Sequence, residues 1–263
     1  MRSNKLRDMW AAGDAAVIGW LGIPSSVSAE NMAHAGWDAL NVDMQHGLID
    51  YQTAVTMLTA ISTTDTVPMV RVPWNEPGII GKMLDAGAYA VICPMVNNRA
   101  DAEALVRACR YPPEGERSFG PVRATWYAGP EYGAKANGTV MVLPMIETRE
   151  AMANLDDILS TPGVDGCYIG PGDLGLSHGY VAKLDRDEPE LVEAIDTILA
   201  VAKKHGRYAG IHCGAPDYAR QMIEKGFNLT TIAADNALLH NAAKAAVNAV
   251  KADGGAKTGG AMY

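Results

Sequence analysis

The sequence predicts a single (β/α)8 barrel, and three observations lead to this prediction. Eight short apolar runs recur along the chain, and segments with helical periodicity separate them. Gly87, Gly206 and Gly226 each follow a predicted helix and precede a predicted strand, which is a common place for a helix C-cap glycine. The length of 263 residues also suits one such barrel, which typically needs about 250.

The predicted strands and helices alternate along the whole chain. Strands are expected at residues 16–20, 39–44, 67–72, 89–93, 140–146, 166–170, 208–212 and 228–233. Helices are expected at residues 28–35, 51–61, 77–86, 99–110, 149–159, 191–204, 216–225 and 238–250. Residues 1–250 are therefore predicted to form one barrel domain, and the Gly-rich residues 251–263 are predicted to be a flexible tail.

One interval departs from the alternation. Between the fourth and fifth strands, residues 111–127 are rich in proline, glycine and aromatic side chains. A loop of this length and composition usually has a role of its own. We therefore expect it to cover an active site or to contact another subunit.

Composition and charge narrow the class of function. The chain carries 22 Lys and Arg against 30 Asp and Glu, and its formal net charge of −8 disfavours binding to nucleic acid and anionic membranes. No apolar run approaches the length of a membrane span, and no export signal is expected. The four cysteines are scattered without CxxC spacing, which indicates reduced thiols. These features predict a cytoplasmic protein that acts on a small molecule.

Polar residues occur at the predicted carboxyl ends of the strands, where barrel enzymes place their chemistry. In chain order they are Trp20, Asp43, Gln45, His46, Arg71, Glu147, Asp173, His212 and Asp235. Each has a plain alternative when taken alone: a packed histidine, a structural salt bridge for Arg71, or a carboxylate at a helix N-terminus for Glu147. Their common placement at one rim favours a functional site.

Two of these residues suggest a metal site. Glu147 and Asp173 each follow an apolar strand, where a carboxylate is either solvated or bound to a positive group. Hard oxygen ligands favour Mg²⁺ or a similar divalent ion over zinc. The lysines fall on helices, loops or tails in this prediction, which argues against an aldolase that forms a Schiff base.

Six motifs together resemble the HpcH/HpaI family of class II pyruvate aldolases. In order between about Gly19 and Leu239, they are Asn41-Val-Asp-Met-Gln-His46, Met69-Val-Arg-Val-Pro-Trp-Asn75, Val91-Ile-Cys-Pro-Met-Val96, Arg110-Tyr-Pro-Pro-Glu-Gly-Glu-Arg117, Met145-Ile-Glu-Thr148 and Asp165-Gly-Cys-Tyr-Ile-Gly-Pro-Gly-Asp-Leu174. The resemblance implies an enzyme that cleaves or forms 4-hydroxy-2-oxo acids from pyruvate and an aldehyde.

The resemblance also implies roles for the acidic pair and its neighbours. Glu147 and Asp173 would bind Mg²⁺, Mn²⁺ or Co²⁺, and pyruvate would chelate the ion through its keto oxygen and one carboxylate oxygen. The backbone N–H groups of Gly172 and Asp173, at the start of a helix, would receive the pyruvate carboxylate.

The remaining rim residues receive roles from the same resemblance. Arg71 would hydrogen-bond the keto oxygen that becomes the enolate, and His46, oriented by Asp43, would serve as acid and base. Trp20 would line the substrate pocket or belong to the core. The family also implies a homo-oligomer, a hexamer in which the last helix packs on a neighbouring barrel.

Two residues depart from the family pattern, and several alternatives stay open. Gln45 stands where many relatives carry Glu, and Met145 where many carry Gln. A thioester lyase acting on citryl-CoA or malyl-CoA is the second candidate function, and a binding or scaffold module is the third. Arg117 and Arg123 could hold an acidic tail of the aldehyde or could anchor their loop through salt bridges.

Overall fold

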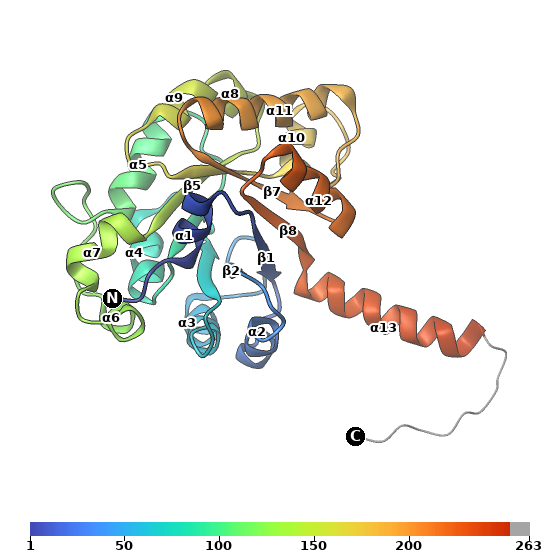
Figure 1. The fold of residues 1–263 in the computed structure, drawn as a ribbon, viewed down its shortest axis with the longest axis horizontal. Helices are drawn as coiled ribbons and strands as arrows, with labels where there is room; N and C mark the ends of the chain where they lie inside the picture. The colour runs from blue at the N-terminus through green and yellow to red at the C-terminus, as the bar shows by residue number, and fades with distance from the viewer. Residues whose placement is uncertain (253–263) are drawn as a thin grey trace.

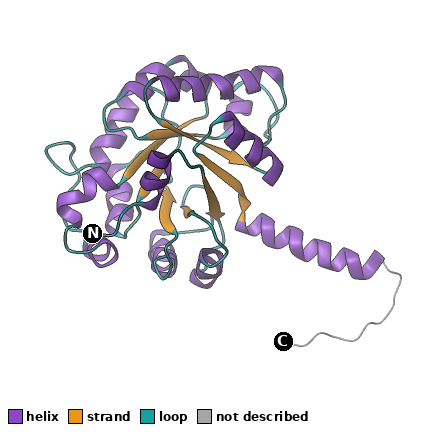
Figure 2. Ribbon diagram, viewed as in Figure 1, coloured by secondary structure: helices purple, strands orange, loops and turns teal. Residues whose placement is uncertain are grey.

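Eight parallel strands close into a barrel, and each strand pairs with the next while β8 pairs with β1. Figures 1 and 2 show the strands at the centre with helices around them. The strands are β1 (Ala16–Leu21), β2 (Ala39–Asp43), β3 (Val67–Arg71), β4 (Ala90–Cys93), β5 (Met141–Ile146), β6 (Gly166–Ile169), β7 (Tyr208–Cys213) and β8 (Leu229–Ala234). This computed structural model describes residues 1–252, and the predicted barrel is confirmed.

The helices of the described chain connect and flank the strands. They are α1 (Lys5–Ala12), α2 (Ser26–Ala33), α3 (Tyr51–Ile61), α4 (Pro77–Asp85), α5 (Arg99–Cys109), α6 (Val122–Ala128), α7 (Tyr132–Thr139), α8 (Arg149–Ala153), α9 (Leu155–Ser160), α10 (Pro171–Ser177), α11 (Pro189–Lys204), α12 (Pro216–Lys225) and α13 (Asp235–Ala252). Gly87, Gly206 and Gly226 all have positive φ, as a C-cap glycine requires.

Two of the predicted segments differ in detail from the structure. The helix expected at residues 149–159 is divided into α8 and α9 at Asn154, whose side chain donates a hydrogen bond to the Asn97 carbonyl. The loop expected at residues 111–127 overlaps α6, which ends at Ala128, and α7 begins at Tyr132. In α6 the small residues Ala124 and Ala128 are buried one turn apart, so a weak apolar stripe was enough to form a helix.

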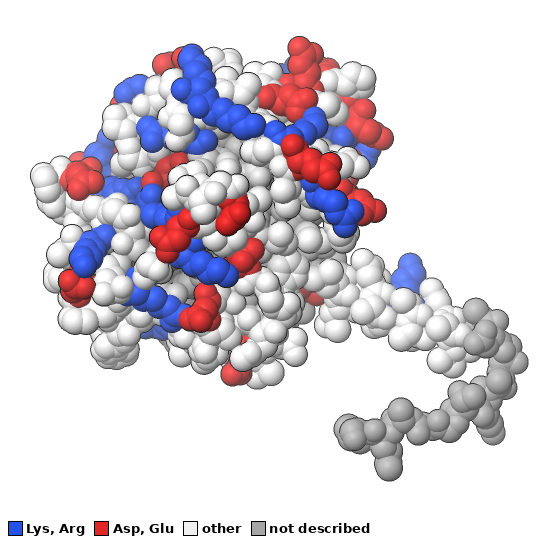
Figure 3. All heavy atoms as spheres, viewed as in Figure 1, with Lys and Arg blue, Asp and Glu red and all other residues white. Residues whose placement is uncertain are grey.

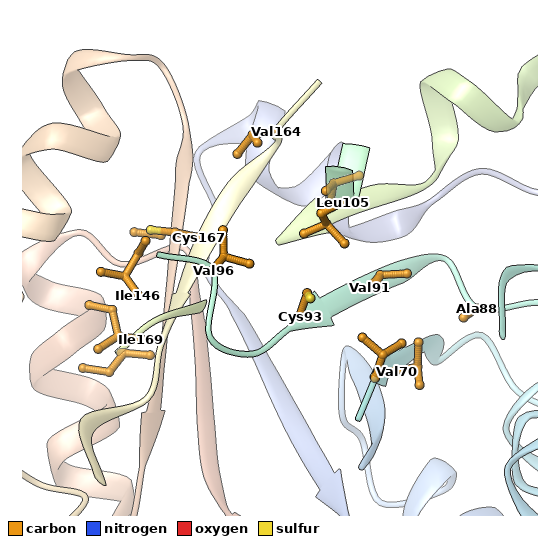
Figure 4. Close-up of a cluster of buried hydrophobic side chains, with 14 of the residues drawn as sticks. Val70, Ala88, Val91, Cys93, Val96, Leu105, Ile146, Val164, Cys167 and Ile169 are labelled. Atoms are coloured by element: carbon orange, nitrogen blue, oxygen red, sulfur yellow. The ribbon is translucent and has the colours of Figure 1, made fainter. Parts of the chain in front are cut away.

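Successive side chains along a strand point in turn into the barrel and out toward the helices, so they form two apolar layers. On β3, Met69 belongs to the cluster inside the barrel, whereas Val70 belongs to the layer between the strands and the helices. Figure 4 shows part of this outer layer, with Val91 and Cys93 of β4 and Leu105 of α5. All four cysteines are free and buried. No helix within residues 1–252 is long and apolar enough to cross a membrane.

Helix α1 closes the amino-terminal end of the barrel. Asn4, its N-cap residue, donates hydrogen bonds to the carbonyls of Tyr89 and Thr139, which precede β4 and β5. The Trp10 indole donates to the carbonyl of Asn228, which precedes β8. Because these carbonyls lie at the starts of strands, the helix lies across that end, and Figure 1 shows it over the barrel.

At the other end of the chain, α13 leaves the barrel. Figure 1 shows this helix projecting beyond the rest of the molecule. Leu239, Val247 and Val250 on it are exposed. The helix was predicted to end at residue 250 and instead continues through Ala252. The rest of the predicted tail, residues 253–263, lies outside the described residues.

Candidate active site

The carboxyl ends of the strands surround a pocket of about 580 Å³. Most of the residues predicted from the sequence line it: Trp20, Asp43, His46, Arg71, Gly172 and Asp173. Glu147 lies beside the pocket, and His212 is part of its wall. Asp235 does not line it and instead accepts hydrogen bonds from the backbone N–H groups of Gly22 and Ile23.

An ion pair between β2 and β3 organises one side of the pocket. Asp43 and Arg71 face each other in the register of the two strands. Arg71 donates from Nε to Asp43 Oδ1 at 2.9 Å and from Nη2 to Asp43 Oδ2 at 2.6 Å, a bidentate arrangement that fixes the guanidinium plane. The guanidinium carbon also lies 4.8 Å from the centre of the Trp20 ring. Arg71 therefore keeps one orientation, and its Nη1 has no partner in the described chain.

Asp43 is the most heavily hydrogen-bonded group of the pocket. Burial opposes its ionisation, but the hydrogen bonds and charge of Arg71, the Trp20 indole and the His46 backbone together hold the pKa of Asp43 below its usual value. The Trp20 Nε1 donates to Oδ2 at 3.1 Å. Asp43 is therefore an anion throughout the neutral pH range.

Asp43 contacts His46 through the backbone of the histidine. The backbone N–H groups of Gln45 and His46 donate to Asp43 Oδ1 at 3.1 and 3.3 Å. No hydrogen bond joins the carboxylate to the imidazole. Asp43 thus fixes the turn that carries His46, and the ring itself has no hydrogen-bond partner in residues 1–252. Gln45, one of the two departures, leaves its Oε1 buried without a partner.

Glu147, at the end of β5, is a buried carboxylate with few protein partners. Its Oε1 accepts a hydrogen bond from the Met95 N–H at 2.8 Å, and Met95 adopts a φ of 54°, a conformation that costs a non-glycine residue about 1 kcal/mol or more. Burial raises the pKa of Glu147 to about 7, nearby Asp173 contributes in the same direction, and Met95 and Arg71 oppose it. A cation beside the two carboxylates would remove this penalty.

The segment that follows β6 brings the second carboxylate to the pocket. α10 begins at Pro171, so Gly172 and Asp173 lie in its first turn, where backbone N–H groups have no partner within the helix. Gly170 must lack a side chain, because a Cβ there would lie 2.5 Å from Glu147 Oε2 and 2.9 Å from Met145 Cε. The glycine lets the two segments approach each other.

The carboxylate oxygens of Glu147 and Asp173 fit a hard divalent ion. Both candidate ligands are carboxylates, and their charges repel each other across the same space. Residues 1–252 contain no group of three or more His, Cys, Asp or Glu side chains that could hold a metal ion. An ion held by Glu147 and Asp173 would therefore depend on water and substrate for its other positions.

Arg186, which holds the start of α10 in place, was not predicted from the sequence. Its buried guanidinium donates from Nε and Nη2 to the Pro171 carbonyl at 3.0 and 2.9 Å, and from Nη2 to the Val181 carbonyl at 2.9 Å. Gly175 provides the space, since a Cβ there would lie 1.8 Å from Nη2. Only the fold brings this arginine to the segment that carries Asp173.

Arg117 and Arg123 lie away from the pocket, and both anchor their segment. Arg117 donates to Asp85 at 2.7 Å and lies over the Tyr111 ring at 4.4 Å, with its side chain almost fully buried. Arg123 donates to the Ala86 carbonyl and, at 2.9 Å, to the Leu58 carbonyl. Both residues therefore anchor their segment, Arg117 through a salt bridge as the alternative expected, and Arg123 through two backbone carbonyls and the hydroxyls of Thr59 and Ser62.

This chain is similar in sequence to known aldolases. Residues 17–242 match the model of the family described as HpcH/HpaI aldolase/citrate lyase. The chain is 46% identical over 241 residues to a hydroxypyruvate/pyruvate aldolase of Rhizorhabdus wittichii, which covers 92% of this chain and 96% of that protein. It is 39% identical over 245 residues to a 4-hydroxy-2-oxo-heptane-1,7-dioate aldolase of Escherichia coli, with coverage of 92% and 93%.

A solved structure agrees with these relatives. A HpcH/HpaI aldolase/citrate lyase family protein from Burkholderia cenocepacia superposes with a TM-score of 0.88 at 32% sequence identity. The alignment covers 95% of this chain and all of that one. The barrel, its closure and the chain order of the strands are therefore those of a known structural family.

The close approach at Gly170 generates a first prediction. Gly170→Ala places a methyl group against Glu147 Oε2 and displaces the carboxylate, so we expect the affinity for Mn²⁺ to fall at least about tenfold. Isothermal titration calorimetry measures it. Gly138→Ala is the matched control, because a Cβ on that α7 glycine meets nothing within 4 Å. Equal Mn²⁺ affinity in the two variants would contradict the assignment of Glu147 as a ligand.

Proposed function

Because this chain belongs to the HpcH/HpaI aldolase/citrate lyase family, we propose that it is a divalent-metal-dependent class II aldolase. It is a carbon–carbon lyase that cleaves 4-hydroxy-2-oxo acids reversibly to an aldehyde and to pyruvate or a close 2-oxo acid. One observation carries the proposal: the Asp43–Arg71 pair and the Glu147 and Asp173 carboxylates meet at one pocket at the strand ends. The barrel fold alone would not support this function, because barrels of this kind catalyse many different reactions.

Glu147 and Asp173 are the residues that would hold the metal, which we propose to be Mg²⁺, Mn²⁺ or Co²⁺. The raised pKa of Glu147 and its single backbone hydrogen bond support a cation as its missing partner. When bound, an ion of this kind polarises a substrate oxygen and lowers the free energy of negative charge that develops there. The first-turn N–H groups of Gly172 and Asp173 would bind the substrate carboxylate.

Arg71 is proposed to bind the keto oxygen of the 2-oxo acid. Removing a proton from C3 of pyruvate moves negative charge onto that oxygen, and a fixed guanidinium beside it stabilises the transition state more than the ground state. Asp43 occupies Nε and Nη2 of Arg71, which leaves Nη1 available to the substrate. Because the ion pair is formed before the substrate binds, the arginine needs little reorganisation during the reaction.

His46 is proposed to transfer the proton between the substrate and solvent. His46 lines the pocket and its ring makes no hydrogen bond within residues 1–252, so neither ring nitrogen is occupied by a protein partner there. The turn that Asp43 fixes sets the position of the ring. Trp20 is proposed to line the pocket, where it also supports Arg71 from one side.

We further propose a cytoplasmic homo-oligomer, a hexamer. Free, buried cysteines are typical of a reducing compartment. The apolar residues on the projecting part of α13 support a contact with a second copy, since such a helix face is unusual in a monomer. In Figure 3 the visible part of that helix carries little charge, whereas charges of both signs are scattered over the barrel.

The metal requirement is tested by removing the ion. Protein stripped with EDTA should release no pyruvate from 4-hydroxy-2-oxo acids, and added Mg²⁺ or Mn²⁺ should restore release, as followed by a coupled lactate dehydrogenase assay. Glu147→Ala or Asp173→Ala should abolish this restoration, because either change removes one of two protein ligands. Metal-dependent activity that survives in either variant would disprove the ligand assignment. Activity on a CoA thioester alone would favour the thioester lyase.

The role of Arg71 is tested by substitution. Arg71→Ala should lower kcat at least about 100-fold, comparable to the loss of an oxyanion-hole donor. The same assay at saturating metal measures it, and Arg220→Ala, which removes an exposed arginine paired only with Asp217, is the control. If kcat of Arg71→Ala equals that of the control, Arg71 has no part in the mechanism.

The oligomer is tested by light scattering at micromolar concentration. The unsubstituted protein should scatter as an assembly, and Val250→Glu should lower the assembled fraction because it places a charge on the apolar face of α13. Val27→Glu is the control, since Val27 on α2 is exposed to the same degree, 73% against 74%. A mass near 27.9 kDa for the unsubstituted protein would rule the assembly out.

A further inference from the structure

Arg186 is a buried cation outside the pocket that the proposed mechanism does not use. Its side chain has no exposed area, and Glu188, 3.2 Å from Nη1, is its one carboxylate partner in the described chain. The other N–H groups are directed at backbone carbonyls: Pro171 accepts from Nε and Nη2, and Val181 accepts from Nη2. The guanidinium therefore binds the backbone at the start of α10.

This place is electrostatically unfavourable for a positive charge. A buried guanidinium loses its hydration, and a cation beside the first turn of a helix opposes the helix dipole. The helix also has to leave room for it, because a Cβ on Gly175 would lie 1.8 Å from Arg186 Nη2. An apolar side chain in the same space would carry neither electrostatic cost. These costs indicate that Arg186 serves to orient the start of α10 rather than to stabilise the barrel.

The hydrogen bonds of Arg186 restrain the two peptide groups that precede Asp173. The Pro171 carbonyl shares one planar trans peptide with the Gly172 N–H, so holding the carbonyl also holds the N–H. The Gly172 carbonyl, 3.5 Å from Nη2, shares the next peptide with the Asp173 N–H. Gly172 has no side chain that could restrain this backbone from within. Arg186 supplies that restraint from outside.

The backbone matters for Asp173 because little else fixes its carboxylate. Asp173 lines the pocket and is exposed there. Within residues 1–252 its side chain forms neither a hydrogen bond nor a salt bridge. The position of the carboxylate therefore follows from the direction in which the backbone of the first turn projects it.

Asp185, the residue before Arg186, fixes the same segment to the barrel. Its carboxylate accepts hydrogen bonds from the backbone N–H groups of Gly214 at 2.7 Å and Ala215 at 3.0 Å, in the turn between β7 and α12. β7 pairs with β6, the strand that precedes α10. Arg186 therefore restrains α10 relative to the barrel, and not merely relative to its own loop.

We propose that Arg186 is a positioning residue that sets the metal affinity of the pocket, because it holds Asp173 where its carboxylate meets that of Glu147. Arg186 does not line the pocket and would not touch the metal or the substrate. This inference rests on the proposed function and adds to its metal site a residue that acts from outside the pocket.

The first test is Arg186→Met, which removes the guanidinium and keeps an unbranched side chain. We expect the Kd for Mn²⁺ to rise at least about tenfold, as is typical when the support of a metal ligand is lost. Isothermal titration calorimetry on the EDTA-stripped protein measures it. Arg207→Met is the matched control, because Arg207 also donates to two backbone carbonyls, those of Leu159 and Thr161, but lies before β7 at the opposite end of the barrel. Equal Kd values in the two variants would overturn the inference.

Gly175→Ala tests the same contact from the side of the helix. Its methyl group would displace Nη2, so this variant should lose Mn²⁺ affinity as Arg186→Met does. When the two changes are combined, the guanidinium is already absent, and the Kd should stay within about twofold of that of Arg186→Met. Losses that multiply in the double variant would contradict the inference, because Gly175 would then act independently of Arg186.

Thermal unfolding of the metal-free variants separates positioning from stability. A lower Tm for Arg186→Met with an unchanged Mn²⁺ Kd would show a purely structural role and reject the inference, while the aldolase proposal would stand. Failure of the unsubstituted protein to bind Mn²⁺, or of Asp173→Ala to weaken binding, would instead refute the proposed metal site. If Arg186→Met does not fold, Arg186→Lys repeats the test, since it keeps the charge but lacks the planar fork that binds two carbonyls, and its Kd should also rise.

Discussion

The ion pair between Asp43 and Arg71 is the interaction on which the rest of the pocket depends. It bridges β2 and β3 at their carboxyl ends, and its carboxylate also receives the Trp20 indole and the backbone of the turn that carries His46. The Asp43 side chain thus sets the plane of the Arg71 guanidinium, the position of the Trp20 ring and the path of the turn after β2. A buried pair of this kind is worth little for stability compared with apolar packing, so its value lies in the orientation that it imposes.

A second constraint acts on the opposite side of the pocket, where unfavourable features are concentrated. Glu147 is a buried carboxylate with a raised pKa, Met95 has a left-handed backbone, and Gly170 leaves no room for even a methyl group. The buried carboxylate and the left-handed backbone each cost free energy. They are compatible with stability because the barrel around them is fully closed, and a bound cation would recover part of the cost.

The sequence was sufficient to predict the barrel and most of the rim because both depend on local patterns. Buried parallel strands are short apolar runs, and the polar residue that ends a strand is visible in one dimension. What could not be predicted depends on contacts between distant segments. Arg186 reaches Pro171 only after the loop between them folds back, α6 is held by two alanines, and the backbone contact of Asp43 with His46 requires knowing the turn.

Closure of the amino-terminal end by α1 has a consequence for the traffic of molecules. Asn4 and Trp10 bind the backbone where β4, β5 and β8 begin, and the barrel interior above them is packed with side chains. Within the described chain, the pocket at the carboxyl ends of the strands has no continuation through the barrel to its amino-terminal end. Under the proposed function, both fragments of a cleaved substrate would therefore enter and leave on the same side of the barrel.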